Sequence, residues 1–231
     1  MDLGLYNLKY GVRRLIRGVL PWFASVDPNA ISWSLLPVGA ATAAVYWLGA
    51  QGRPWLYLVG AALIFLRMFL GTLDGLVAVH YGRGTPRGEV VNRLAPELCD
   101  VMLVTALALA RPEWLLPGVG ALALAWLTTF SGLVGATAGA PTQSVGPVGQ
   151  TDRLAALQLS SFAAFAAETF GYGVDFLWVF LWWTIAGGIL TVVLRLHRTL
   201  RATGTVAAAQ PSDPAAPSSD PAPPAPDPAA R

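Results

Sequence analysis

Residues 54–73, PWLYLVGAALIFLRMFLGTL, form an apolar run whose single charge is Arg67. About 20 such residues in a helix cross the roughly 30 Å of hydrocarbon in a bilayer. The whole chain shares this composition, because 55% of its 231 residues are hydrophobic and only 12% are charged. A soluble domain usually carries about twice that charged fraction. We therefore expect an integral membrane protein rather than a soluble enzyme, a disordered chain or a coiled coil.

Five further apolar segments accompany this run. The six lie near residues 30–50, 54–73, 93–110, 114–134, 154–170 and 176–194. The fifth is diluted by Gln158, Ser160, Ser161 and Glu168. Either a polar face turned into a bundle or a helix on the membrane surface explains this dilution, and we favour the first. The predicted fold is an all-α membrane protein with six transmembrane helices.

The two ends of the chain have a different composition from this bundle. Residues 1–27 place basic and apolar side chains at helical spacing, which predicts an amphipathic helix on an anionic membrane surface. A cleaved signal peptide is the alternative, but the first 18 residues contain no uninterrupted apolar core. Residues 204–231 consist mainly of Ala, Pro, Ser and Asp and predict a disordered tail. The membrane domain then comprises residues 28–203.

Basic residues are distributed unevenly between the predicted loops. Arg53 and Arg111 lie on one side. The other side holds Lys9, Arg13, Arg14, Arg17, Arg83, Arg87, Arg93, Arg153, Arg195, Arg198 and Arg201. Because cytoplasmic loops carry an excess of Lys and Arg, both termini and the loops 74–93 and 136–153 are predicted to face the cytoplasm.

Polar residues gather where the second and third segments meet this cytoplasmic side. Two stripes at helical spacing are Arg67, Gly71, Asp74, Ala78 and Gly88, Asn92, Pro96, Asp100. A charge at the centre of a membrane helix costs about 2.5–3.5 kcal/mol, so each one needs a partner or a function. We expect the stripes to face each other across a cavity. An ion pair between Arg67 and Asp74, about 10.5 Å apart along a helix axis, is the purely structural alternative.

These stripes resemble the signature of the CDP-alcohol phosphotransferase family, D-x-x-D-G-x-x-A-R, eight residues, then G-x-x-x-D-x-x-x-D. The matching residues are Asp74, Gly75, Ala78 and Gly88. Residues 28–32, PNAIS, resemble the family's P-N-x-[IL]-[ST], and residues 146–153, GPVGQTDR, resemble its G-P-x-G-K-x-D-R. The resemblance covers residues 28–194 and implies six membrane helices and a homodimer. Together with the loop charges, it places the site at the predicted cytoplasmic side.

The family displaces CMP from a CDP-linked alcohol, usually a lipid, with the hydroxyl of an acceptor alcohol. Its four carboxylates hold two divalent cations, and the last carboxylate deprotonates the acceptor. Only Asp74 remains here, because Gly71, Asn92 and Pro96 replace the other three. Val79 and Gln150 also replace the family's arginine and lysine. Whether the chain is an enzyme is therefore open.

Roles for the site residues follow from the resemblance. Asp74, Asn92 and Asp100 are candidate metal ligands, with Mg or Mn as the cofactor if the protein is active. Asp100 is also a candidate to replace the base missing at Pro96, and its alternative is a buried carboxylate bonded within the bundle. Pro96 either begins the third helix or lies inside it and leaves the Asn92 carbonyl without a donor.

The candidate substrate-binding residues are Asn29, Ser32, Arg67, Gly75, Ala78, Gly88 and Arg153. Arg153 matches a family position that binds phosphate; an arginine that reaches the lipid headgroups is the alternative. Asn29 matches the nucleotide end of the family's site, and its alternative is a helix N-cap. The expected partners are a CDP-linked lipid or alcohol, an acceptor alcohol and membrane lipids, but no nucleic acid.

Three functional hypotheses remain. The first is a CDP-alcohol phosphotransferase of phospholipid biosynthesis with an altered site. The second is a non-catalytic relative that keeps the headgroup cavity and acts as a lipid-binding or partner subunit. A transporter is the third, since six spans with charges at depth would permit one. Small residues such as Gly132, Gly135, Gly187 and Gly188 are predicted to allow close helix approach.

Overall fold

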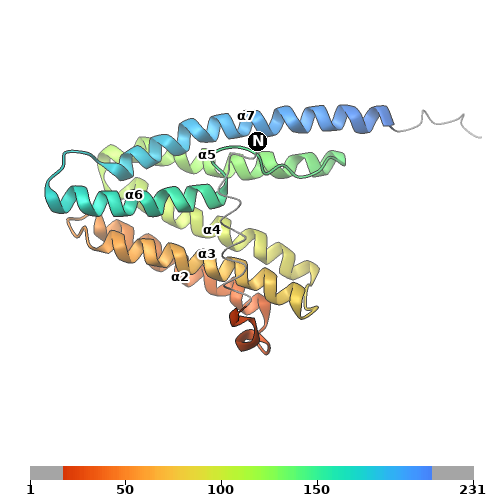
Figure 1. The fold of residues 1–231 in the computed structure, drawn as a ribbon. Helices are drawn as coiled ribbons and strands as arrows, with labels where there is room; N and C mark the ends of the chain where they lie inside the picture. Colours follow the sequence, from red (N-terminus) through yellow and green to blue (C-terminus); the bar gives the residue numbers. More distant parts are fainter. Residues whose placement is uncertain (1–17, 210–231) are drawn as a thin grey trace, which may run out of the picture.

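The structure, a computed structural model, describes residues 18–209, with side chains to residue 203. Every regular secondary-structure element in this part of the chain is a helix, and it contains no strand. The long helices are α2 (Pro28–Gly49), α3 (Leu56–His80), α4 (Pro86–Ala110), α5 (Leu115–Leu133), α6 (Gln150–Phe170) and α7 (Phe176–Ala209) (Figure 1). Short 3-10 helices are η2 (Leu20–Phe23), η3 (Pro112–Trp114) and η4 (Val134–Ala138). The all-α prediction is confirmed, and each predicted apolar segment corresponds to one long helix.

Four stretches of the described residues are long and apolar enough to cross a membrane. They are Pro28–Gly49, Leu56–His80, Pro112–Ala138 and Phe176–Thr203. Helices α4 and α6 fall outside this group, although they are 25 and 21 residues long and run beside the other helices (Figure 1). The count of six spans therefore stays a prediction.

The polar residues of α6 face the bundle, as we favoured. Gln158 donates from Nε2 to the carbonyl oxygen of Ala61 in α3 at 3.0 Å. The hydroxyl of Ser161 lies 2.5 Å from that of Tyr46 in α2. Buried polar groups need such partners inside a membrane protein, because lipid offers none.

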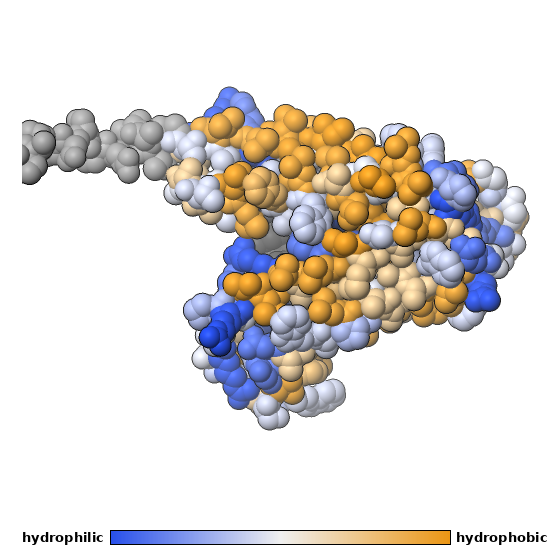
Figure 2. Space-filling view, turned by 180° about the vertical axis from the view of Figure 1, so that it is seen from behind, coloured by the Kyte–Doolittle hydropathy of each residue, from blue (hydrophilic) through white to orange (hydrophobic). Residues whose placement is uncertain are grey.

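The helices form two groups that diverge toward one end of the molecule. Helix α2 packs on α3 and α4, α5 packs on α7, and α6 contacts both α3 and α7. The α2–α4 group and the α5–α7 group lie close together at the loop between α6 and α7 and separate toward the end that bears η2 (Figure 1). Apolar surface covers much of the middle of both groups, hydrophilic residues gather at their ends, and the molecule is hollowed between the groups (Figure 2).

Glycines allow close approach within the chain, as predicted. A Cβ added at Gly188 would lie 2.9 Å from Cβ of Leu124, and one at Gly135 would lie 2.9 Å from Cγ2 of Thr199. Similar conflicts arise at Gly132 and at Gly187. All four glycines therefore serve contacts of α5, η4 or α7 with the same chain, and the homodimer stays a prediction.

Helix α4 begins earlier than predicted. Thr85 caps it by accepting a hydrogen bond from the Gly88 amide at 3.0 Å, and Pro86 occupies the first turn. Pro96 therefore lies inside α4, and the interpretation of Pro96 as the first helical residue is wrong. Because proline has no N–H, Pro96 gives the Asn92 carbonyl no helical hydrogen bond.

Both ends of the described region bear on the predicted terminal segments. Residues 1–17 and 210–231, which hold most of the predicted surface helix and tail, lie outside the described residues. Helix α7 continues to Ala209, so the prediction of disorder is wrong for residues 204–209. Extending an existing helix needs no new nucleus, and residues 207–209 are alanines with high helix propensity.

Candidate functional site

Two adjoining cavities lie at the diverging end of the bundle. The larger, of about 560 Å³, is lined by α3, α4, the start of α6 and one residue of α2. The smaller, of about 230 Å³, is lined by α2, α3, the α3–α4 loop and α4. Gly75, Val79 and Asn92 line both cavities. The two predicted stripes thus face a common space, as the helical spacing indicated.

Most of the predicted site residues line these cavities. The larger cavity includes Arg67, Gly71, Gly75, Asn92, Pro96 and Gln150. The smaller cavity includes Asn29, Ser32, Asp74, Gly75, Ala78, Gly88 and Asn92. Asp100 and Arg153 line neither of them.

The smaller cavity depends on the close approach of α2 and α4. The side chain of Asp27 caps α2 by accepting from the Asn29 amide at 2.9 Å, so Asp27, rather than Asn29, is the N-cap. A Cβ at Gly88 would lie 2.7 Å from Oδ1 of Asn29. Glycine at position 88 therefore lets the Asn29 amide reach the first turn of α4.

Asp74 is buried where α3 meets α2. Its Oδ2 accepts a hydrogen bond from the Ser32 hydroxyl at 2.6 Å, and its Oδ1 accepts one from the Gly75 amide at 2.6 Å. Both carboxylate oxygens are thus held by neutral donors. This contact fixes two predicted residues, Ser32 and Asp74, side by side in the wall of the smaller cavity.

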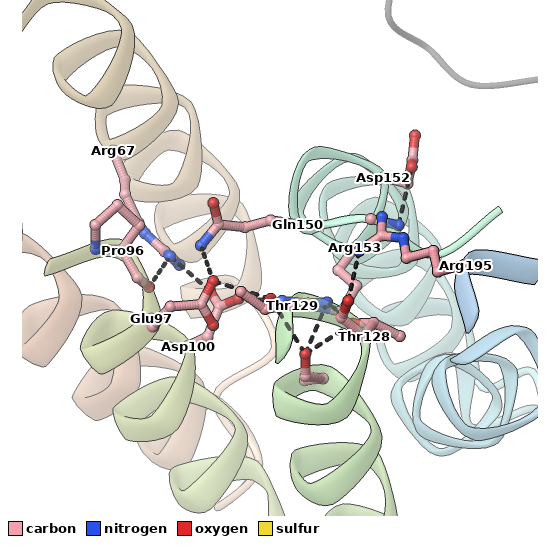
Figure 3. Close-up of polar contacts among 12 residues, drawn as sticks. Arg67, Pro96, Glu97, Asp100, Thr128, Thr129, Gln150, Asp152, Arg153 and Arg195 are labelled. Atoms are coloured by element: carbon pink, nitrogen blue, oxygen red, sulfur yellow. Dashed lines mark hydrogen bonds and ion pairs between the residues drawn. The ribbon is translucent and has the colours of Figure 1, made fainter. Parts of the chain in front are cut away.

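Asp100 joins two arginines inside the bundle (Figure 3). Its Oδ1 lies 2.6 Å from Nη2 of Arg67, and its Oδ2 lies 2.7 Å from Nη2 of Arg153. Each of these residues is at most 4% exposed. Arg67 also donates to the carbonyl oxygen of Pro96 at 2.5 Å, and Arg153 donates to the Thr128 hydroxyl at 3.0 Å.

This network decides between the alternatives left open by the sequence. Arg67 pairs with Asp100, so the alternative of an ion pair between Arg67 and Asp74 is wrong. For Asp100, the alternative of a buried carboxylate bonded within the bundle is confirmed. These ion pairs join α3, α4 and α6. The sequence could not predict them, because the spacing of residues along one helix does not show which other helices it contacts.

Glu97 is a neighbouring residue that was absent from the predicted site. Its Oε1 accepts from the Thr129 hydroxyl at 3.1 Å and from Nε2 of Gln150 at 3.2 Å (Figure 3). Gln150 stands where the family motif has lysine, so an amide takes that position beside Glu97. The place of Glu97 beside Pro96 makes it a possible replacement base in the sequence, but helical geometry turns it by about 100° from the predicted stripe.

Arg153 and Arg195 were counted among the charges of the cytoplasmic loops, and this interpretation is wrong. Both are buried, at 4% and 7% exposure. Arg195 donates to the carbonyl oxygens of Val145 at 2.8 Å and Thr128 at 2.5 Å. The two arginines therefore hold α5, the η4–α6 loop and α7 together and add little charge to the surface.

The residues present do not fit the family's two-metal centre. The described residues contain no cluster of three or more Asp, Glu, His or Cys side chains that could hold a metal ion. Asp74 supplies one carboxylate, whereas two divalent cations need several anionic oxygen ligands. Asp100 would have to leave both arginines to bind a metal. In this structure Asp100 is not part of the cavity walls that contain Asp74 and Asn92.

Comparison with solved structures identifies the architecture. Phosphatidylinositol phosphate synthase of Mycobacterium tuberculosis, solved with CDP-DAG bound, superposes with a TM-score of 0.65 at 18% identity, over 84% of this chain and 96% of that one. The fold is that of a CDP-alcohol phosphotransferase. The same synthase in complex with manganese and citrate gives 0.64 at 18% identity, over 84% and 91% of the two chains. The resemblance drawn from the signature residues is thus confirmed at the level of the fold.

A sequence relative indicates a membrane location. The inner membrane protein YnbA of Escherichia coli (strain K12) is 28% identical over 202 residues, which are 82% of this chain and 96% of YnbA. No protein-family model matches the chain. Together with the four long apolar helices, this relative identifies the chain as an integral membrane protein.

Proposed function

We propose that this protein binds a CDP-linked lipid in the two adjoining cavities and does not transfer its phosphoryl-alcohol group. This is the non-catalytic alternative drawn from the sequence, within phospholipid metabolism. The observation that carries it is the site itself, which keeps the cavities but has one carboxylate, Asp74, at the four signature positions. The CDP-DAG bound to the M. tuberculosis synthase supports the class of ligand.

The shape and chemistry of the cavities suit an amphiphilic ligand. Apolar side chains of α3 and α6, including Phe65, Met68, Phe69 and Leu154, line the larger cavity and suit acyl chains. Asn29, Ser32 and other polar residues line the smaller cavity and suit a nucleotide headgroup.

Transfer would require a base that this site does not supply. A general base must lie within hydrogen-bond reach of the acceptor hydroxyl. The family's base position is Pro96, which has no titratable group. Asp100, the candidate replacement, has both oxygens in ion pairs with arginines and lines neither cavity.

The second candidate is a transferase with a reduced ligand set. Asp74 lines the smaller cavity beside Asn92, which is shared by both cavities, so one carboxylate and one amide oxygen remain where substrate would lie. Mg or Mn would be the cofactor of such an enzyme, and a structure of the M. tuberculosis synthase contains manganese.

We further propose that six helices span the membrane and that both termini and the cavities face the cytoplasm. The uneven distribution of basic residues supports this orientation even when the buried Arg153 and Arg195 are left out. A cytoplasmic opening would expose the smaller cavity to nucleotide headgroups, while the larger cavity reaches lipid from the same end.

The test is CMP release from CDP-diacylglycerol by the detergent-purified full-length protein. A panel of acceptor alcohols is supplied with Mg²⁺, with Mn²⁺ or with EDTA, and the M. tuberculosis synthase serves as the positive control. We expect CDP-diacylglycerol to bind and no CMP to appear above the level of protein-free samples. Metal-dependent CMP release that Asp74→Asn abolishes would overturn the proposal and establish the second candidate.

A further inference from the structure

The larger cavity has a positive wall. Among the described residues that line it, none is a carboxylate, and Arg67 is the one cationic side chain. A two-metal centre has the opposite character, because its walls must be anionic to hold the cations. We infer that the diphosphate of a CDP-linked lipid is held directly by Arg67 and neighbouring neutral donors, without a divalent cation. This inference rests on the proposed function and specifies how that ligand is recognised.

Arg67 is fixed in position to act on an anion. Its Nη2 is held by Oδ1 of Asp100 and by the carbonyl oxygen of Pro96, while the side chain still lines the cavity (Figure 3). Asp100 divides its single negative charge between Arg67 and Arg153, so it does not neutralise both arginines. The neighbouring carboxylate, Glu97, accepts hydrogen bonds from Gln150 and Thr129 and does not line the cavity. An arginine held in this way presents a planar set of N–H donors, the geometry that suits phosphate oxygens.

Neutral donors lie on the opposite walls of the same cavity. The Asn92 amide faces it from α4, and Thr151 faces it from the first turn of the 21-residue helix α6. The N-terminus of a helix favours negative charge through its dipole. Arg67, Asn92 and the start of α6 therefore surround the space with groups that stabilise an anion.

Gly71 leaves room for the diphosphate in the larger cavity, beside the smaller cavity that we assign to the nucleotide. A Cβ built at Gly71 would have no atom nearer than Cδ1 of Leu35 at 3.9 Å. The family places its first aspartate at this position, so a carboxylate that would repel a metal-free diphosphate is replaced by open space. Pro96, at the position of the last aspartate, also lines the cavity without a charge.

The experiment measures binding of CDP-diacylglycerol to the full-length protein in detergent, with EDTA and with Mn²⁺. We expect the same Kd in both conditions. Arg67→Gln should weaken binding by at least about tenfold, because it removes a charge-assisted contact to phosphate. Arg87→Gln, which removes an exposed arginine outside both cavities, is the matched control and should bind as the unmodified protein does.

A second variant distinguishes a loss of affinity from misfolding. It is needed because Arg67→Gln leaves Asp100 with one arginine. Arg67→Lys keeps the positive charge and loses the planar fork, so it should fold and show an intermediate loss of affinity. Neutral diacylglycerol is the second ligand and should not compete. Equal competition by diacylglycerol, or unchanged affinity in both Arg67 variants, would overturn the inference.

The outcomes separate this inference from the proposed function. Binding that requires Mn²⁺ would overturn the metal-free recognition and leave lipid binding intact. Absence of binding in both conditions, from protein shown to be folded, would overturn the proposed function as well.

Discussion

Asp100 is the counterion of two buried arginines, Arg67 and Arg153. It is 3% exposed and pairs with two arginines that are equally buried. Removing one partner of a buried ion pair leaves an uncompensated charge that lipid and protein cannot solvate. The stability of the site therefore depends on a carboxylate that the sequence had suggested as a metal ligand.

Asp100→Asn tests this role. We expect a loss of about 3–5 kcal/mol in the free energy of unfolding, because Arg67 and Arg153 would share no counterion. Chemical unfolding in detergent measures the change. Glu89→Gln is the matched control, since the Glu89–Arg93 pair at 2.7 Å is more than half exposed and should contribute at most about 1 kcal/mol. Similar losses in the two variants would contradict the assignment.

The glycines provide a second prediction at the scale of single residues. Gly71→Ala has open space around the new Cβ and should be neutral or stabilise α3 by about 0.5–1 kcal/mol, because alanine has the higher helix propensity. Gly118→Ala would place its Cβ 2.6 Å from the Ala108 backbone and should destabilise by about 1–3 kcal/mol. Thermal unfolding measures the stability of both variants. A Gly118→Ala variant more stable than Gly71→Ala would contradict the close contact between α5 and Ala108.

The positions around the cavities could be predicted from sequence, whereas the ion pairs could not. Spacing of three and four residues correctly brought Gly71, Asp74 and Asn92 to the faces of α3 and α4 that line the cavities. The pairing of Arg67 with Asp100 depends on the register between helices, which one sequence does not contain. Burial of Arg153 was missed for the same reason.

At the scale of the elements, polar contacts tie the helices together at the end opposite the cavities. Nη2 of Arg111 lies 2.7 Å from Oε1 of Glu168 at the end of α6. The guanidinium carbon of Arg111 lies 4.7 Å from the ring centroid of Trp114. The indole of Trp114 donates to Asp175 before α7 at 2.6 Å. Burial lowers the pKa of the Arg111 guanidinium, but the hydrogen bond to Glu168 and nearby negative charge raise it above its ordinary value overall.

A double-mutant cycle on Arg111→Gln and Glu168→Gln tests this connection. Both side chains are about one quarter exposed, so solvent screens the pair and we expect a coupling of about 0.5–1 kcal/mol. Unfolding in detergent at low and high salt gives the coupling and its screening. A coupling of zero at low salt would show that the loops, rather than this ion pair, hold the helix groups together.

The start of α4 shows where element prediction failed. Apolar content indicated a helix from residue 93, but the cap at Thr85 and the proline at position 86 begin it seven residues earlier. A search for apolar runs does not detect the first turns of α4, because these turns contain polar residues. They also place Gly88 and Asn92 in the cavity walls.

At the scale of the whole molecule, the predicted orientation can be checked with two loop glycines. Gly84, between α3 and α4, and Gly173, between α6 and α7, have no atom within 4 Å of an added Cβ. Gly173→Cys should react with a membrane-impermeant thiol reagent in intact cells, whereas Gly84→Cys should react only after permeabilisation. The native Cys99 is 1% exposed and should give little background. Labelling of Gly84→Cys in intact cells, with Gly173→Cys labelled only after permeabilisation, would show that the predicted orientation is reversed.

The architecture was the most predictable property of this molecule, because six apolar segments and three motif blocks agreed with it. The metal centre was the least predictable, because it depends on which charges neutralise one another in three dimensions. We infer that this protein binds a CDP-linked lipid without a divalent metal ion.

Titration of the full-length protein with Mn²⁺ in the presence of CDP-diacylglycerol tests this claim most directly. Electron paramagnetic resonance measures the free Mn²⁺, and the M. tuberculosis synthase, solved in complex with manganese, is the control that should remove it from solution. We predict no stoichiometric uptake of Mn²⁺ by this protein. Uptake of one or two ions per chain that Asp74→Asn abolishes would contradict the account.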